Sequence, residues 1–392
     1  MSVFRPREKF LILEVGPKET CGLFLSVDED RNIIFEKFEK GVNLAKFLRA
    51  PSRRVADQSW EGRPLFNGRR RLAVAADASL ATTIPVPLEL HRDAANAKSR
   101  ITLAELENLI AQAMARIFNG CRTEAAGRLG LSDLDAVLVS AKAKQFGVDR
   151  SDVEDPVGYP GKKITLLLEF TFTGRALAEE LKPFFNSPEP FFFAEAPQAH
   201  LASLARVRAL PLSLVAADGD GTSLFVLQKA KDDYAVLYRE ALDWRFNSLF
   251  EALQEAFGVS PRAAKDLYCA YRRGEVSEGV ARVFRAALEP ALDAFFREMA
   301  RAKVSGTAYV DHPHGLPTEA SRRRGGARFE PHPAEEIAAH LGFTADLDAF
   351  RVSRDDRARV RRLLIYFLES YFDKSSTEIN QKLRRRLHWL AA

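Results

Sequence analysis

The chain has 392 residues, enough for two or three domains, and its 46% hydrophobic and 28% charged residues are typical of an ordinary folded protein. No apolar run reaches the roughly 18 residues that indicate a transmembrane helix. The net charge of +5 comes entirely from residues 321–392, because the preceding residues carry equal numbers of both signs. A neutral body argues against a nucleic-acid-binding protein. Three scattered cysteines and the absence of a signal-peptide core predict a cytoplasmic location.

Short apolar runs separated by glycine or charged turns predict a β-meander near the start, followed by a helix and a further strand. The predicted strands are 10–15, 23–27, 33–35 and 72–76, and the helix is 42–48. An amphipathic helix is predicted over 102–119, where Thr102 and Glu105 match a capping box. Strands over 136–140 and 164–172 flank a loop at 155–161.

A second β-meander with glycine turns begins about 200 residues after the first and is also followed by helices. Its strands are predicted at 212–216, 224–227 and 234–238, and its helices at 247–257, 261–273, 277–302 and 355–372. Two such units predict two related α/β halves. Their turns can cradle phosphates, because consecutive backbone N–H groups point the same way.

The last fourteen residues form an amphipathic pattern at helical period, with Ile379, Leu383, Leu387 and Leu390 on one face. Basic residues lie mostly off this face, and Trp389 borders it. Two interpretations stay open: a helix that binds an anionic membrane, or a terminal helix docked on the body. The predicted membrane-binding residues are Ile379, Lys382, Leu383, Arg384, Arg385, Arg386, Leu387, Trp389 and Leu390.

Several segments in the same order resemble the actin-like ATPase superfamily and, within it, the bacterial cell-division protein group FtsA. They are Leu11-Ile-Leu-Glu-Val-Gly16, Asp77-Ala-Ser-Leu-Ala-Thr-Thr83, the 102–119 helix, the Pro156-Val-Gly158…Gly161 loop and Glu195-Ala-Pro-Gln-Ala-His-Leu-Ala202. The resemblance covers most of residues 8–310, and the basic tail matches the group's membrane-targeting helix in kind and place.

The resemblance implies an α/β, actin-like (ribonuclease-H-like) fold of two lobes with an FtsA-type inserted α+β subdomain. The implied domains are a first lobe (1–98), the inserted subdomain (99–175), a return to the first lobe (176–210), a second lobe (211–372), and a linker with the basic amphipathic helix (373–392).

The nucleotide site departs from the family pattern at five places. Glu14 stands where the family has Asp, and Ala217 stands at the second Asp position. Trp244-Arg245 replaces paired glycines, and Ala264-Lys265-Asp-Leu-Tyr268 replaces the Ala-Glu-x-x-Lys that touches the nucleoside. The late Gly-Gly turn beside adenosine is replaced by Asp311-His-Pro-His-Gly-Leu-Pro317.

These losses remove carboxylates that orient Mg²⁺-bound water and glycines that let the backbone approach the ligand. Gly16, Gly219, Gly221 and Thr222 survive as weak cofactor-binding candidates, so ATP with Mg²⁺ stays open as a ligand. We expect a degenerate ATPase with no catalytic residue and no useful hydrolysis.

The resemblance implies a non-enzymatic division adaptor on the inner face of the cell membrane. It would tether a tubulin-like FtsZ polymer at the septum, as part of the divisome, and could form filaments. The first alternative is the related pilus-assembly protein PilM, which binds the cytoplasmic tail of a membrane partner. The second is a working actin-like ATPase or sugar-kinase relative.

Two further motifs were weighed as metal sites. Asp218-Gly-Asp-Gly221 has the look of a calcium loop but lacks the distal glutamate of an EF-hand, which favours a plain turn. His312-Pro-His314, with His332 beyond, lacks cysteine or spaced acidic partners, which favours a solvated loop. No metal site is predicted, and no Cys/His pair is evident from sequence spacing.

Overall fold

The structure is a computed structural model. It describes residues 8–41, 44, 71–93, 96, 98–185, 191–217, 221–229, 235–304, 306–312, 314–317, 327–330, 333–373 and 377–390. The side chains of residues 185, 354, 355 and 385–390 lie outside this description. Most of the helix predicted at 42–48 lies outside the described residues.

The chain divides into two compact units. Unit 1 comprises Met1–Ser203, Ala338–Arg351 and Arg362–Ala392, and unit 2 comprises Leu204–Ile337 and Val352–Arg361.

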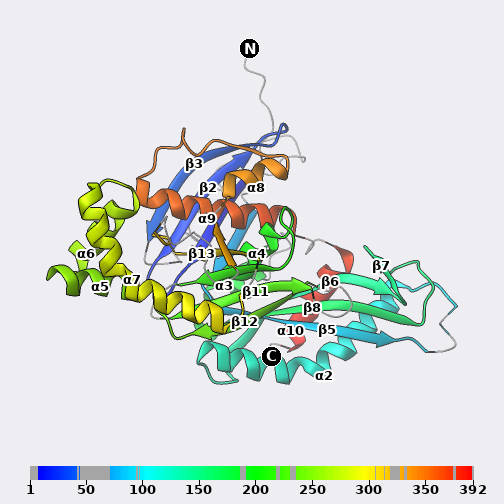
Figure 1. The fold of residues 1–392 in the computed structure, drawn as a ribbon. Helices are drawn as coiled ribbons and strands as arrows, with labels where there is room; N and C mark the ends of the chain where they lie inside the picture. The colour runs from blue at the N-terminus through cyan, green and yellow to red at the C-terminus, as the bar shows by residue number, and fades with distance from the viewer. Residues whose placement is uncertain are drawn as a thin grey trace, which may run out of the picture. The chain divides into compact units, whose positions relative to one another are not determined.

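Unit 1 contains a sheet whose strand order is β15-β3-β2-β1-β4-β9 (Figure 1). The strands are β1 (Glu8–Val15), β2 (Thr20–Val27), β3 (Asn32–Gly41), β4 (Arg71–Ala76), β9 (Phe192–Glu195) and β15 (Thr344–Ala345). The first three are antiparallel, whereas β4 runs parallel to β1 and β9 runs parallel to β4. The predicted meander is confirmed, and β1 and β2 are almost wholly buried because both faces of the sheet are covered.

Unit 2 repeats this topology with the order β12-β11-β10-β13-β14. Its strands are β10 (Leu212–Ala216), β11 (Thr222–Lys229), β12 (Ala235–Leu242), β13 (Gly306–Asp311) and β14 (Ala327–Glu330). Strands β10 to β12 are antiparallel, and β13 and β14 add in parallel beyond β10. The two related α/β halves predicted from the meanders are therefore present.

A second sheet within unit 1, of order β5-β8-β6-β7, forms the inserted α+β part. Its strands are β5 (Ala81–His91), β6 (Ala136–Val148), β7 (Ser151–Val153) and β8 (Lys163–Gly174). Helix α2 (Leu103–Leu129) packs on this sheet, and so does helix α10 (Glu378–Leu390) (Figure 1). The core of the insertion contains residues from β5, β6, β8, α2 and α10.

The predicted capping box at the start of α2 is half formed. Thr102 Oγ1 accepts the Glu105 N–H at 3.2 Å. The Glu105 carboxylate instead accepts two bonds of 2.8 Å from the buried Arg92 guanidinium, which also donates to the carbonyls of Ser99 and Gly161. Hydrogen bonding to Arg92 lowers the pKa of Glu105. Arg92 therefore ties the start of α2 to the loops beside β5 and β8.

The remaining helices connect these sheets. They are α3 (Arg175–Phe185), α4 (Ala196–Leu204), α5 (Ser248–Phe257), α6 (Pro261–Arg272), α7 (Glu278–Arg301), α8 (Ala334–His340) and α9 (Arg354–Tyr371). Helices α5, α6 and α7 and the predicted α9 lie where their periodicity placed them. Ser260 and Ser277 cap α6 and α7 with their side chains, which explains where these helices begin.

Candidate functional site

The first family position of the candidate nucleotide site lies in unit 1, at the end of β1. Glu14 stands there and is buried. Its Oε2 lies 3.0 Å from Nη2 of Arg362, and its Oε1 accepts a hydrogen bond from the Tyr366 hydroxyl at 3.3 Å. Only 11% of the Glu14 side chain and 8% of the Arg362 side chain are exposed, so this is a buried ion pair. The carboxylate is thus held by two groups of α9.

Helix α9 reaches Glu14 because it packs on the sheet face that carries Phe10. The Phe10 and Phe367 rings meet edge to face with centroids 5.0 Å apart. Arg362 and Tyr366 are separated by one helical turn, so both point to the same place. A carboxylate that already neutralises a buried guanidinium is poorly suited to orient the water shell of Mg²⁺.

The turn after β1 closes on itself. The Gly16 N–H donates to the Glu19 carbonyl at 3.0 Å, so this donor is used within the turn. A Cβ at Gly16 would lie 3.1 Å from the same oxygen, which explains why glycine fits here. Gly16 therefore lies in the turn after β1, as predicted, but its N–H is hydrogen-bonded within that turn.

In unit 2, the corresponding turn is partly described. Gly219 lies outside the described residues. Gly221 has open space around it, and Thr222 begins β11 with its hydroxyl buried and without a hydrogen-bond partner among the described residues. Ala217, at the second Asp position, is 3% exposed and donates its N–H to the Asp311 carbonyl at 3.2 Å. No carboxylate is supplied by this position.

In unit 2, aromatic side chains cluster at the segments that the resemblance associates with the nucleoside. The His312 imidazole stacks on the Phe246 ring with centroids 3.4 Å apart and planes 19° from parallel. Phe250 and Tyr268 close the cluster edge to face, 5.3 Å apart. Tyr268 and His312 belong to the two segments that the resemblance associates with the nucleoside, and Phe246 and Phe250 follow Trp244-Arg245. Trp244, at the former glycine pair, is buried and donates Nε1–H to the Ala291 carbonyl at 2.9 Å.

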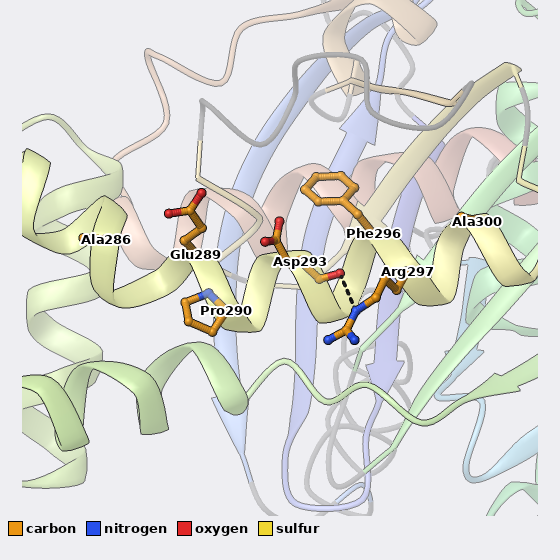
Figure 2. A pocket seen from close by; sticks show the side chains of 7 residues that line it. All are labelled: Ala286, Glu289, Pro290, Asp293, Phe296, Arg297 and Ala300. Carbon is orange, nitrogen blue, oxygen red and sulfur yellow. Dashed lines mark hydrogen bonds between the residues drawn. The ribbon is translucent and has the colours of Figure 1, made fainter.

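The described residues therefore place an ion-paired Glu14 and an alanine, Ala217, at the two positions where the family has Asp. Among them, no group of three or more His, Cys, Asp or Glu side chains is arranged to hold a metal ion. A groove also runs along α7, with the Glu289 and Asp293 carboxylates on one side of the helix (Figure 2). It carries no nucleophile or cluster of metal ligands among its described lining residues, Ala286, Glu289, Pro290, Asp293, Phe296, Arg297 and Ala300.

Helix α10 docks on the inserted part of unit 1. Ile379 and Leu383, two of the predicted membrane-binding residues, belong to the core of the insertion and are 5% and 0% exposed. Lys382 pairs with Glu107 of α2 at 3.3 Å, and Arg384 donates to the Phe184 carbonyl at 3.0 Å. These four side chains engage the protein, as in the docked alternative, so they cannot enter a bilayer while α10 stays docked.

The side chains of Arg385, Arg386, Leu387, Trp389 and Leu390 lie outside the described part of the chain, so membrane binding itself stays a prediction. No helix among the described residues is long and apolar enough to cross a bilayer.

Asn380 fixes the docking register of α10. Its side-chain Oδ1 accepts the Ala143 N–H at 2.8 Å, and its Nδ2 donates to the Ala143 carbonyl at 3.2 Å. The side chain thus pairs with β6 as a neighbouring strand would, on the side away from β8. A buried amide so fully paired favours one docked arrangement, because a shifted helix would leave Ala143 unsatisfied.

A buried ionic network lies next to the hydrogen bonds between Asn380 and Ala143. Lys142 pairs with Asp373 at 2.9 Å, and Lys144 pairs with Glu169 at 2.8 Å. Burial alone would lower the pKa of Lys144, but the carboxylates of Glu169, Glu369 and Asp373 outweigh it and hold that pKa above its ordinary value. The end of α9 is therefore tied to the same strand that holds α10.

Comparison with solved structures identifies the fold. The chain superposes on a structure of the PilM–PilN type IV pilus biogenesis complex with a TM-score of 0.50 and 15% identity, covering 93% of this chain and 98% of that one. Weaker likenesses include the ethanolamine utilization protein EutJ from Carboxydothermus hydrogenoformans (TM-score 0.34, 10% identity, 94% and 92% covered). Another is a Bacteroides thetaiotaomicron protein with an actin-like ATPase fold (TM-score 0.34, 7% identity, 90% and 95% covered).

The chain has the actin-like, two-lobed α/β fold. The predicted fold is therefore confirmed, whereas these likenesses do not single out the FtsA group. No protein-family model and no curated protein matches the chain.

Proposed function

We propose that this chain is a non-catalytic actin-like adaptor of the pilus-assembly type, which binds the cytoplasmic segment of a PilN-like membrane protein. The docking of α10 carries the proposal. Because Ile379 and Leu383 complete the core of the insertion, the tail is occupied within the protein. Membrane recruitment would then depend on a partner. The fold is one that this chain shares with a structure of the PilM–PilN type IV pilus biogenesis complex.

The two half-sites support the absence of catalysis. Phosphoryl transfer depends on positioned Mg²⁺ and on charge stabilisation around the phosphates. Here Glu14 is held by Arg362, Ala217 supplies no carboxylate, and His312 lies stacked against Phe246. A protein of this fold without nucleotide chemistry acts through its surfaces.

An FtsA-like tether is the second candidate. The basic run Lys382 to Arg386 in the middle of the terminal helix favours it, since each cation near an anionic bilayer contributes roughly 1 kcal/mol. Such a tether requires α10 to leave the insertion and expose Ile379 and Leu383. It would also require binding to an FtsZ-like polymer.

Flotation on anionic liposomes separates the two candidates. We expect the full-length protein to stay unbound on plain anionic vesicles and to float when the vesicles display the cytoplasmic segment of the PilN-type protein from the same organism. A chain ending at Lys374, checked for folding by circular dichroism, is the comparison on plain vesicles. If the full-length protein floats on plain vesicles and the shortened chain does not, the pilus-type proposal is wrong and the FtsA-like tether is favoured.

A further inference from the structure

Unit 2 brings together a cysteine and a histidine that lie 45 residues apart in the sequence. Cys269 lies on α6, one turn before its end, and His314 follows β13. The Cys269 Sγ atom is 3.3 Å from Nδ1 of His314, which is hydrogen-bonding distance for a thiol and an imidazole. Cys269 is not in a disulfide and is partly exposed.

The main chain around His314 is held on both sides. The His314 N–H donates to Nδ1 of His312 at 3.2 Å, and its carbonyl accepts from the Arg272 guanidinium. The next carbonyl, of Gly315, accepts the Tyr268 hydroxyl at 2.7 Å. Gly315 has a φ of +54° and lies against the Arg272 guanidinium. His314 is thus fixed beside the thiol by α6 itself.

One cation near Cys269 would stabilise a thiolate. Arg272 lies one turn along α6, and an ionised Cys269 would interact favourably with it. Burial lowers the pKa of Arg272, but a guanidinium keeps its charge at neutral pH. Arg361 is a second cation near Arg272. The carboxyl end of α6 acts in the opposite direction, because the helix dipole is negative there. A histidine in direct contact together with a neighbouring arginine is the setting that activates cysteine.

The other two cysteines are buried. Cys21 and Cys121 are 4% and 6% exposed. Burial, with the nearby Glu124 charge, raises the pKa of Cys121 to about 11. They serve as internal controls for any reaction at Cys269.

We propose that Cys269 is a nucleophilic thiol activated by His314, and that it takes up a low-molecular-weight disulfide by thiol–disulfide exchange. His314 accepts the thiol proton, and the Cys269 sulfur attacks one sulfur of the disulfide R–S–S–R. The S–S bond of the reagent breaks as the Cys269–S–S–R bond forms. The thiolate RS⁻ leaves and takes the proton from His314. The product is a mixed disulfide beside the His312 and Phe246 stack.

The aromatic disulfide 5,5′-dithiobis(2-nitrobenzoate), added to the folded full-length protein, tests this proposal. Peptide mapping after partial reaction should find Cys269 modified at least about tenfold faster than Cys21 and Cys121. The variant His314→Gln should slow the Cys269 reaction about tenfold at pH 7 and react like the wild type near pH ~10, where an accessible thiol is ionised without help. His91→Gln, a change at an exposed histidine on β5, is the matched control and should have no effect.

Equal rates for the His314→Gln and wild-type proteins at pH 7 would overturn the proposal, as would modification of Cys269 only after denaturation. The wild-type rate profile gives an independent readout should His314→Gln not fold. A Cys269 rate that already rises through the neutral range supports activation, whereas a rise confined to alkaline pH contradicts it.

Discussion

Replacing Arg362 with alanine is expected to lower the free energy of unfolding by about 3–5 kcal/mol. The substitution removes the guanidinium that lies 3.0 Å from the Glu14 carboxylate, in a place where both side chains are about nine-tenths buried. Glu14 would keep the Tyr366 hydroxyl but lose its balancing charge. Urea or guanidinium denaturation of the full-length protein measures the effect.

Arg361→Ala is the matched control for this prediction. Arg361 is adjacent on α9 and pairs with Glu335 at 2.9 Å, but 41% of its side chain is exposed. Exposed pairs contribute roughly 0–1 kcal/mol, so little change is expected. The double variant Glu14→Leu/Arg362→Met should recover most of the loss, because apolar side chains replace the pair without leaving a buried charge. If Arg362→Ala and Arg361→Ala lowered the free energy of unfolding by equally small amounts, the buried pair of Glu14 and Arg362 would contribute no more than an exposed pair.

Replacing Leu383 with alanine is expected to cost about 2–5 kcal/mol. Leu383 is fully buried in the core that α2 and the inserted sheet share, so its loss leaves a cavity between α10 and the insertion. Hydrogen exchange is the more specific measurement. The Ala143 amide, held by Asn380 in the docked helix, should exchange much faster in the variant.

Lys382→Ala is the control, since its pair with Glu107 is partly exposed and is expected to contribute at most about 1 kcal/mol. In Lys382→Ala, the Ala143 amide should exchange as slowly as it does in the wild type. If Leu383→Ala changes neither stability nor this protection, α10 is not docked in solution, and the membrane-tether interpretation gains.

Apolar runs between short turns predicted the strands of the two meanders. The two meanders are runs of apolar residues between short turns, and the sheets follow from them. Strand β5 was missed because Pro85 and Pro87 argue against a strand. The structure accommodates both because β5 is an edge strand that pairs only with β8.

The end of α2 shows a different limit. The predicted helix stops at Asn119 before a glycine, whereas the observed helix continues to Leu129. Cys121, Ala125 and Ala126 continue the buried face beyond Gly120, and this packing outweighs the roughly 1 kcal/mol cost of a helical glycine. The helix then ends at Gly130, whose left-handed conformation provides the cap.

For the candidate site, the sequence could show only which of the family's nucleotide-binding residues are replaced. The sequence identifies Glu14 and Ala217 as departures, but the groups that engage Glu14 lie about 350 residues away, and no spacing rule connects them. One signal was present. Arg362 stands inside the apolar stripe of α9, and a charge at a buried helix position requires a partner.

The pairing of Cys269 with His314, and the stacking of His312 on Phe246, likewise depend on tertiary packing. The sequence assigned His312 and His314 to a solvated loop, but the structure holds both against helices of unit 2. For the tail, amphipathicity alone could not decide between a bilayer and the chain's own insertion, because both bury the same apolar face.

Calorimetric titration of the full-length protein with ATP and Mg²⁺ tests the central claim most directly. Glu14 is held by Arg362 and Tyr366, and aromatic side chains cluster at the segments of unit 2 that the resemblance associates with the nucleoside. We therefore expect no saturable binding at nucleotide concentrations up to about 1 mM. Magnesium-dependent binding with a dissociation constant below about 100 μM would contradict this expectation and would favour the working ATPase.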